Sequence, residues 1–295
     1  MIEPIPAYAR AIGTMLALVA FLVLAFCMVL TTAGAAVTIA TVHNTATYTV
    51  GTAPRVRVDL QYGALIVEEG RDGRVVVDDH RSAGSITRAA AGATANQTHV
   101  TINQQADQVD IRETNPTFQL VSLGRSAQLT LQVPAHTDLD VTSLGNVTVS
   151  GIDGNVRIQG SSGNTTLSHV SLRGDSTIDG GTGGVHLDNV TLSGNASLKS
   201  AVGDLAFTGS LTPGGGTNLR ISAGRFSNVS ITLPHPTDAR ATVATRTGNL
   251  NPDPIWHFSP VQSGSSRGWT ADLGPNPTGT VTVTTEGGNI DFGAR

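Results

Sequence analysis

Apolar and polar residues alternate along most of this chain, and the alternation itself repeats about every twenty residues. Apolar residues stand two and four positions after a glycine, as Val147 and Val149 do after Gly145. Alternation with a period of two predicts strands with one buried face. The glycines that mark the repeat are Gly145, Gly163, Gly183, Gly203 and Gly224.

Each repeat contains a second alternating segment, such as Val156 and Ile158 in the first unit. A repeat therefore holds at least two short strands joined at Gly-Asn or Gly-Asp. Glycine adopts positive φ without a steric penalty, and Asn or Asp beside it can hydrogen-bond its own backbone. We expect this conformational freedom to explain the glycine corners.

Two short strands cannot bury an apolar face alone, but units stacked ~4.8 Å apart share one core. The predicted fold is therefore all-β, a parallel β-solenoid (β-helix-like) of roughly 20-residue turns. An antiparallel sandwich is the alternative, and recurrence of the apolar offsets at the full period favours the solenoid. The predicted domain spans residues 55–295, with a divergent insertion at 82–126 and a long loop at 251–279.

The N-terminal region has a different character, because residues 11–40 contain no charged side chain. This run exceeds the ~20 residues that span a bilayer as a helix, and it predicts one transmembrane anchor. We expect a short cytoplasmic tail at 1–10, a linker at 41–54, and a single-pass protein of the cell membrane with its C-terminal domain outside the cytoplasm. A cleaved signal peptide is the alternative, with small residues at 33–36.

One stretch carries a family resemblance. The segment LTLQVPAHTDLDVTSLGNVTVSGIDGNVRIQGSSGN has a Val133-Pro134 entry followed by strand, Gly-Asn corner, strand. It resembles the bacterial putative-adhesin family, whose repetitive β-strand domains lie behind an N-terminal membrane anchor. The resemblance implies surface adhesion, and it supplies no catalytic or binding residues.

Composition narrows the function classes. Charged residues make up 14% of the chain, the net charge is −4, and basic residues are scattered, so nucleic acid is not an expected partner. The single cysteine, Cys27, excludes an internal disulfide and a cysteine-based zinc site. We predict no cofactor and no metal.

Two groups of residues are candidates for a binding site. His186, Asp188 and Asp179 concentrate titratable groups within the repeat, and a solvated, salt-linked face is the interpretation that we favour over a catalytic role. Trp256 and Trp269 lie in the long loop, where they either bind a ligand or cover an open end of the β-structure.

The predicted function is a non-catalytic surface binding or adhesion module that engages an envelope polysaccharide or another surface protein. One alternative is a carbohydrate-active enzyme centred on His186, Asp188 and Asp179. Another is a structural or scaffolding module for envelope sensing.

Overall fold

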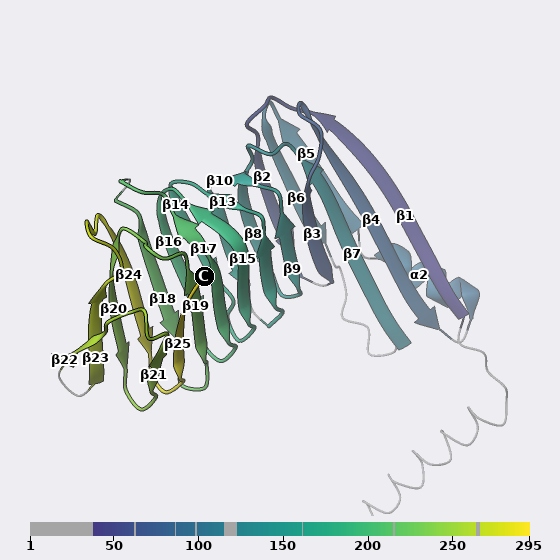
Figure 1. Ribbon diagram of the computed structural model, residues 1–295. Helices are drawn as coiled ribbons and strands as arrows, with labels where there is room; N and C mark the ends of the chain where they lie inside the picture. Colours follow the sequence, from purple (N-terminus) through teal and green to yellow (C-terminus); the bar gives the residue numbers. More distant parts are fainter. Residues whose placement is uncertain are drawn as a thin grey trace, which may run out of the picture.

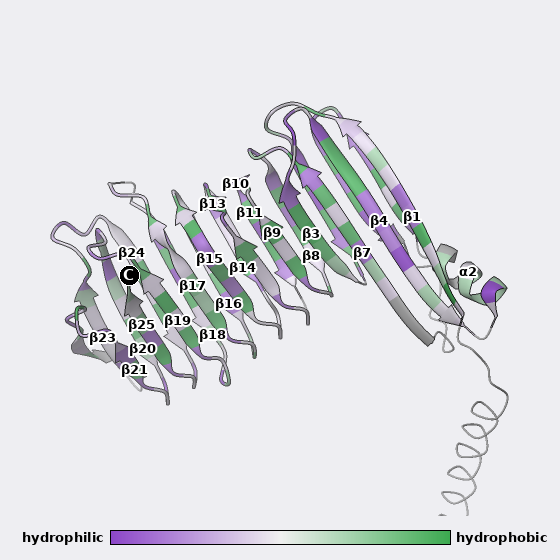
Figure 2. Cartoon of the chain, turned by 45° about the vertical axis from the view of Figure 1, so that its right-hand side comes forward, coloured by the Kyte–Doolittle hydropathy of each residue, from purple (hydrophilic) through white to green (hydrophobic). Residues whose placement is uncertain are grey.

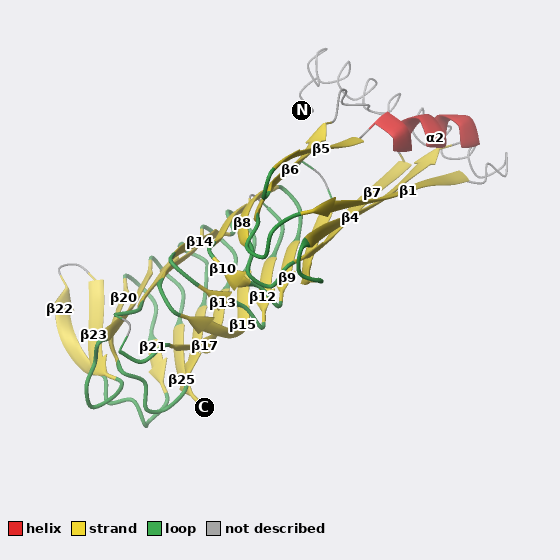
Figure 3. Ribbon diagram, turned by 90° about the horizontal axis from the view of Figure 1, so that it is seen from above, coloured by secondary structure: helices red, strands yellow, loops and turns green. Residues whose placement is uncertain are grey.

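The protein is all-β in a computed structural model that describes residues 38–295 except 62, 86, 98, 115–122, 161, 215 and 264–265. Within these residues the chain forms a 13-stranded sheet and a 12-stranded sheet, here named sheet A and sheet B. The two sheets lie face to face along a long body (Figures 1 and 3). Their facing sides enclose one apolar core of Val, Leu, Ile, Ala and Phe side chains.

Sheet A runs from the N-terminal part of the chain to the C-terminal part. In spatial order it contains β1 (Thr38–Thr49), β4 (Arg74–Ser85), β7 (Leu123–Val133), β3 (Ala64–Glu69), β9 (Val147–Ser150), β12 (Thr165–Ser168), β15 (Val185–Leu192), β17 (Leu205–Leu211), β19 (Val229–Leu233), β25 (Ile290–Ala294) and β21 (Leu250–Pro252), with β10 (Asp153–Gly154) and β13 (Ser171–Leu172) beside β15.

Sheet B covers the opposite side of the core. In spatial order it contains β5 (His99–Gln105), β6 (Gln108–Thr114), β2 (Arg55–Leu60), β8 (Asp138–Ser143), β11 (Val156–Gly160), β14 (Asp175–Asp179), β16 (Asn195–Ser200), β18 (Asn218–Ala223), β24 (Gly279–Thr285), β20 (Ala239–Thr245), β23 (Ser266–Asp272) and β22 (Ser259–Ser263).

The middle strands of both sheets pair in parallel with the strands of the next repeat. In sheet A, Thr165 lies opposite Val147 on one side and Val185 on the other. In sheet B, Ile158 lies between Val141 and Ile178. Residues at equal offsets in the repeat therefore stack in columns, and alternate columns are hydrophobic and buried (Figure 2).

At the N-terminal end of both sheets and at the C-terminal end of sheet B the strands pair antiparallel instead, whereas at the C-terminal end of sheet A β21 pairs in parallel with β25. β1, β4 and β7 form one antiparallel group, β5 and β6 a hairpin, and β20, β23 and β22 another group. The prediction of a parallel β-solenoid is therefore wrong, because the strands form two large mixed sheets. The reason lies outside the repeat. A repeat of about twenty residues holds two strands and their corners, so β1 and β4, with 12 residues each, are too long to belong to one.

The expected insertion and long loop contain regular structure. Within 82–126 lie the end of β4, the helix α2 (Arg88–Gln97), β5, β6 and the start of β7. The helix contacts β1 and β4, and its own residues Ala91 and Ala95 are buried. Within 251–279, β22 and β23 form a hairpin on β20.

The expectation of a membrane anchor is also corrected. None of the helices described from residue 38 onward has the length and apolar character to cross a bilayer. Residues 38–49, expected to be the end of the anchor and the start of the linker, alternate in side-chain exposure and form β1. A single-pass anchor at 11–40, and the membrane location inferred from it, are therefore not supported, and residues 1–37 lie outside the described part.

The corner glycines are required for close contact between repeats. Gly145, Gly163, Gly183 and Gly203 do not have positive φ, contrary to the expectation from the sequence. A Cβ on Gly163 would lie 2.1 Å from the carbonyl carbon of Gly145, and a Cβ on Gly183 would lie 1.9 Å from the carbonyl oxygen of Gly163. The backbones of successive repeats thus touch at this corner, and no side chain fits between them.

Side chains beside the glycines hydrogen-bond the next repeat. The Asn146 side-chain oxygen accepts a hydrogen bond from the backbone N–H of Asn164 (2.9 Å), and the Asn164 side chain accepts one from Gly184 (3.0 Å). Asp204, Asn228 and Asn289 accept the corresponding bonds from Asn228, Asn289 and Asn249. This ladder satisfies backbone donors that the corner leaves outside the strands.

Replacing Gly163 with Ala tests the backbone contact. We expect Gly163→Ala to lower the free energy of unfolding by about 3 kcal/mol or more, or to prevent folding, because the new methyl group overlaps backbone atoms that cannot rotate away. Gly92→Ala is the matched control, because its Cβ would meet open space in α2 and alanine favours the helix. Urea unfolding measures both, and equal midpoints for Gly163→Ala and wild type would contradict the account.

Thr165 tests the buried columns. Its side chain is buried between Val147 and Val185, and its hydroxyl has no hydrogen-bond partner among the described residues. We expect Thr165→Val to raise the free energy of unfolding by about 1 kcal/mol, because it removes an unsatisfied polar group at nearly constant volume. Thr148→Val, on the exposed face of β9, should change little. A destabilised Thr165→Val would show that the hydroxyl has a favourable contact.

Candidate functional site

The outer face of sheet B carries rows of polar side chains that follow the strand register. One row crosses four adjacent strands with charges of alternating sign: Asp110 on β6, Arg57 on β2, Asp140 on β8 and Arg157 on β11. The Arg57 Nε lies 3.9 Å from an oxygen of Asp140. The neighbouring row places Arg55 opposite Asp138. Opposite charges on adjacent strands stabilise this part of the sheet.

This face is hollowed where β2, β8 and β11 meet. A shallow hollow of about 180 Å³ is lined by Arg55, Asp138, Asp140, Arg157 and neighbouring residues. Asp138 begins β8, and its backbone N–H donates to the carbonyl of Pro54 (3.0 Å). Strand register therefore fixes two arginines and two carboxylates around one depression.

A second hollow adjoins the first and has a volume of about 470 Å³. It is lined by His136, Asp153 and Arg173, and it shares Asp138 and Asn155 with the first hollow. We call the two hollows together the polar groove. Asp138 holds the shared wall, because its carboxylate accepts a hydrogen bond from the backbone N–H of Asn155 (2.9 Å).

Asp153 organises the second hollow. Its carboxylate accepts two hydrogen bonds from Arg173, through Nε and one terminal nitrogen, and lies 3.1 Å from Nδ1 of His136. The Asp153 side chain is 22% exposed, whereas those of Arg173 and His136 are 60% and 57% exposed. The carboxylate is thus occupied by the protein, and the two basic side chains present their outer edges to solvent.

The groove offers both donors and acceptors. Within the described part of the chain, neither Arg55 nor Arg157 pairs with a carboxylate at 4.0 Å or less, so their guanidinium groups are available to a ligand. The charged lining residues are three arginines and three aspartates, so with His136 neutral the lining has no net charge. This arrangement suits hydroxyl groups, which both donate and accept hydrogen bonds.

The three titratable candidates from the sequence do not lie together. His186 and Asp188 are exposed on β15 of sheet A, where His186 lies between Thr166 and Ala206. Asp179 lies on β14 of sheet B opposite Lys199, and its carboxylate accepts a hydrogen bond from the backbone N–H of Gly181 (3.0 Å). The described geometry forms no shared site from these three residues, and a binding role for each stays a prediction.

Both tryptophans lie near the C-terminal end of the sheets. Trp256 is buried and makes edge contacts with His235 (4.9 Å between ring centroids) and Phe292 (6.1 Å). Trp269 is half-buried on β23, opposite Val243 of β20. These packing contacts cover the end of the core, and binding by either tryptophan stays a prediction.

An ion pair fastens the terminal hairpin to β20. Arg240 Nε donates to Asp272 (2.7 Å), on the strand next to β20. This hydrogen bond holds the pKa of Asp272 below its ordinary value. Both side chains are more than half exposed, so solvent screens the pair and it adds little to stability.

The groove residues did not emerge from the sequence. Asp153 and Arg173 are twenty residues apart, so the repeat period was a usable signal for that pair. His136 and Asp138 lie in the Val133-Pro134 segment that carries the family resemblance. Arg55 gave no such signal, because the residues between it and Asp138, its neighbour in the sheet, interrupt the repeat pattern.

No protein-family model matches the chain, and no curated protein matches it either. Solved structures that are similar to it include a putative cell adhesion protein from Clostridium sporogenes. That protein is 9% identical, the match covers 86% of this chain and 100% of that chain, and the TM-score is 0.35.

Two further similar structures come from Parabacteroides distasonis. One is a putative adhesin (10% identity, 85% of this chain and 97% of that chain, TM-score 0.39). The other is a putative lipid binding protein (10% identity, 84% of this chain and 96% of that chain, TM-score 0.32). The resemblance to putative adhesins stated from the sequence agrees with the descriptions of the Clostridium sporogenes protein and of the Parabacteroides distasonis putative adhesin.

Proposed function

We propose that this protein is a non-catalytic binding module that recognises an uncharged polysaccharide through the polar groove. The observation that carries the proposal is the shared wall of the two hollows, where Asp138 and Asn155 belong to both. A groove that continues from one hollow to the next accommodates consecutive units of an extended chain.

The chemistry of the lining supports a polyhydroxylated ligand. Asp138 and Asp140 offer carboxylate acceptors, and Arg55 and Arg157 offer donors that no carboxylate of the described chain occupies. Hydrogen bonds between a sugar hydroxyl and a charged side chain are stronger than hydrogen bonds between two neutral groups. The balanced lining charge favours a neutral chain over a polyuronate or a polyamine.

Binding without turnover is consistent with the same groups. Asp153 is occupied by Arg173 and His136, so this carboxylate is not free to act as a general acid or base. Adhesion to a surface coated with the polysaccharide would then result from many weak contacts made by many copies.

Replacing Arg157 tests the proposal. The purified protein is screened on an array of neutral and uronate-containing polysaccharides, and the best neutral ligand is titrated by calorimetry. We expect Arg157→Ala to weaken binding about tenfold, the effect of one charge-assisted hydrogen bond. Asp138→Asn should also weaken binding, while its amide oxygen still accepts the hydrogen bond from Asn155.

Arg220→Ala is the matched control. Arg220 lies in the same row of outer side chains as Arg157, three strands further along sheet B and away from the groove. We expect this variant to bind like wild type. Equal losses in Arg157→Ala and Arg220→Ala, or no neutral polysaccharide bound on the array, would contradict the proposal.

A further inference from the structure

The edge strands of the two sheets differ greatly in length and composition. At the C-terminal end, β21 has three residues including Pro252, and β22 has five including Pro260. At the N-terminal end, β5 has seven residues and β1 has 12. Proteins usually protect edge strands by shortening them or by placing proline or charge on them, because an open edge pairs with other strands.

β1 lacks all of these protections. Its sequence, TIATVHNTATYT, contains no proline and no Asp, Glu, Lys or Arg. It pairs with β4 in unbroken register from Thr38 opposite Ser85 to Thr49 opposite Arg74, so no bulge turns the strand away. Within the described residues β1 is the last strand of sheet A, and its second edge faces no other strand (Figure 1).

The inner side of β1 is incompletely covered. Even-numbered side chains such as Ala40, Val42 and Ala46 point toward the core side and are only half-buried, although α2 contacts this strand. No side chain of β1 reaches the burial of its counterparts on β4, where Val75 and Val77 lie in the core. An additional strand beside β1 would remove more of this surface from water.

We propose that β1 pairs antiparallel with β1 of a second copy of this chain, which joins two sheets A into one continuous sheet. The composition of β1 favours a second copy of this chain as the partner, because a two-fold axis places β1 beside an identical β1. A charged strand would repel itself in that arrangement, and β1 carries no permanent charge.

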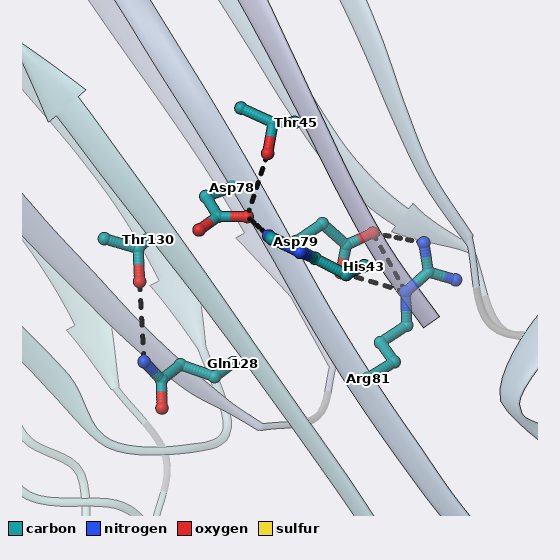
Figure 4. Close-up of polar contacts among 7 residues, drawn as sticks. All are labelled: His43, Thr45, Asp78, Asp79, Arg81, Gln128 and Thr130. Atoms are coloured by element: carbon teal, nitrogen blue, oxygen red, sulfur yellow. Dashed lines mark hydrogen bonds and ion pairs between the residues drawn. The ribbon is translucent and has the colours of Figure 1, made fainter. Parts of the chain in front are cut away.

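The geometry limits the register of this pairing. The inner faces of both copies stay on one side of the sheet only if residues of equal parity lie opposite each other. The two-fold axis therefore passes at a residue, and pairing over nearly the full length of β1 places it at His43 or at Asn44. The His43 ring contacts Asp78 of its own copy (2.5 Å; Figure 4). It also lies edge-on to His80, so its contacts are made within one copy.

Paired over their full length, the strands would form roughly a dozen hydrogen bonds between the copies. The interface lies at β1, on the edge of sheet A, whereas the polar groove is lined by β2, β8 and β11 of sheet B and by β10. The proposal is therefore independent of polysaccharide recognition, and either can fail without the other.

Two variants of β1 that carry opposite charges test the pairing. The variants are Thr41→Lys with Thr47→Lys, and Thr41→Glu with Thr47→Glu, both on the exposed outer face of β1. With the axis at Asn44 the two positions lie opposite each other across the interface, and with the axis at His43 they lie on a diagonal. The full chain is studied in mild detergent, so that the uncharged run from 11 to 37 stays dispersed in every sample.

Light scattering after size-exclusion chromatography, with native mass spectrometry, measures the oligomeric state. We expect a dimer for the wild type, an affinity at least tenfold weaker for each double variant alone, and recovery of a heterodimer when the two variants are mixed. Recovery on mixing shows that both variants are folded. Thr148→Lys with Thr242→Lys, which adds the same charge away from the edge, should remain dimeric.

Three results would overturn the proposal. The first is a monomeric wild type at the highest concentration reached, which would leave β1 open to a strand from another protein. The second is a lysine variant that dimerises as well as the wild type. The third is a pair of variants that remain monomeric on mixing although thermal unfolding shows both to be folded.

Discussion

Close backbone contact between successive repeats is the constraint on which the rest of this structure depends. At one corner the chain passes so near to the previous repeat that a Cβ on Gly145 would lie 1.6 Å from the carbonyl oxygen of Gly63. The side chains of Asn146, Asn164 and their counterparts satisfy the amides that this contact exposes. Glycine and asparagine together keep each repeat in register with the next, and the apolar columns follow from that register.

The same register determines which side chains lie together on the outer surface. Since equal offsets stack from strand to strand, Arg57, Asp140 and Arg157 come into one row without any helix or long loop to position them. Side chains on a hydrogen-bonded sheet are held more rigidly than those on loops, which lowers the entropic cost of binding an extended ligand. The groove around Asp138 is thus a consequence of the stacking, and the short strand β10 together with Arg173, which directly follows β13, forms its second wall.

The sequence predicted the local structure of the repeat well. The all-β class, the strands at Val147–Ser150 and Val156–Gly160 and the buried side chains follow from alternation alone. The attribution of the corner glycines to positive φ was wrong. A glycine required for contact with a backbone 18 or 20 residues away looks the same in the sequence as a glycine required for positive φ. The mixed sheets were missed because the antiparallel pairing of β1, β4 and β7 depends on strand partners and not on periodicity.

The candidate site was harder to predict than the fold. Titratable residues close in sequence, such as Asp179 and His186, separate onto opposite sheets because the corner at Gly183 turns the chain between them. Residues far apart in sequence, such as Arg55 and Asp138, become neighbours because β2 and β8 pair in parallel. Site prediction for this architecture needs the strand order, which cannot be read from the sequence between residues 82 and 126 because the repeat pattern is interrupted there.

The most direct test of the central claim is a crystal structure with a bound oligosaccharide from the neutral polysaccharide that the protein retains best. The account predicts sugar units lying along the polar groove, with hydroxyl groups hydrogen-bonded to Asp138 and Arg157 and the chain continuing toward Arg173. An oligosaccharide bound elsewhere, for example against His186 and Asp188 on sheet A, would contradict it.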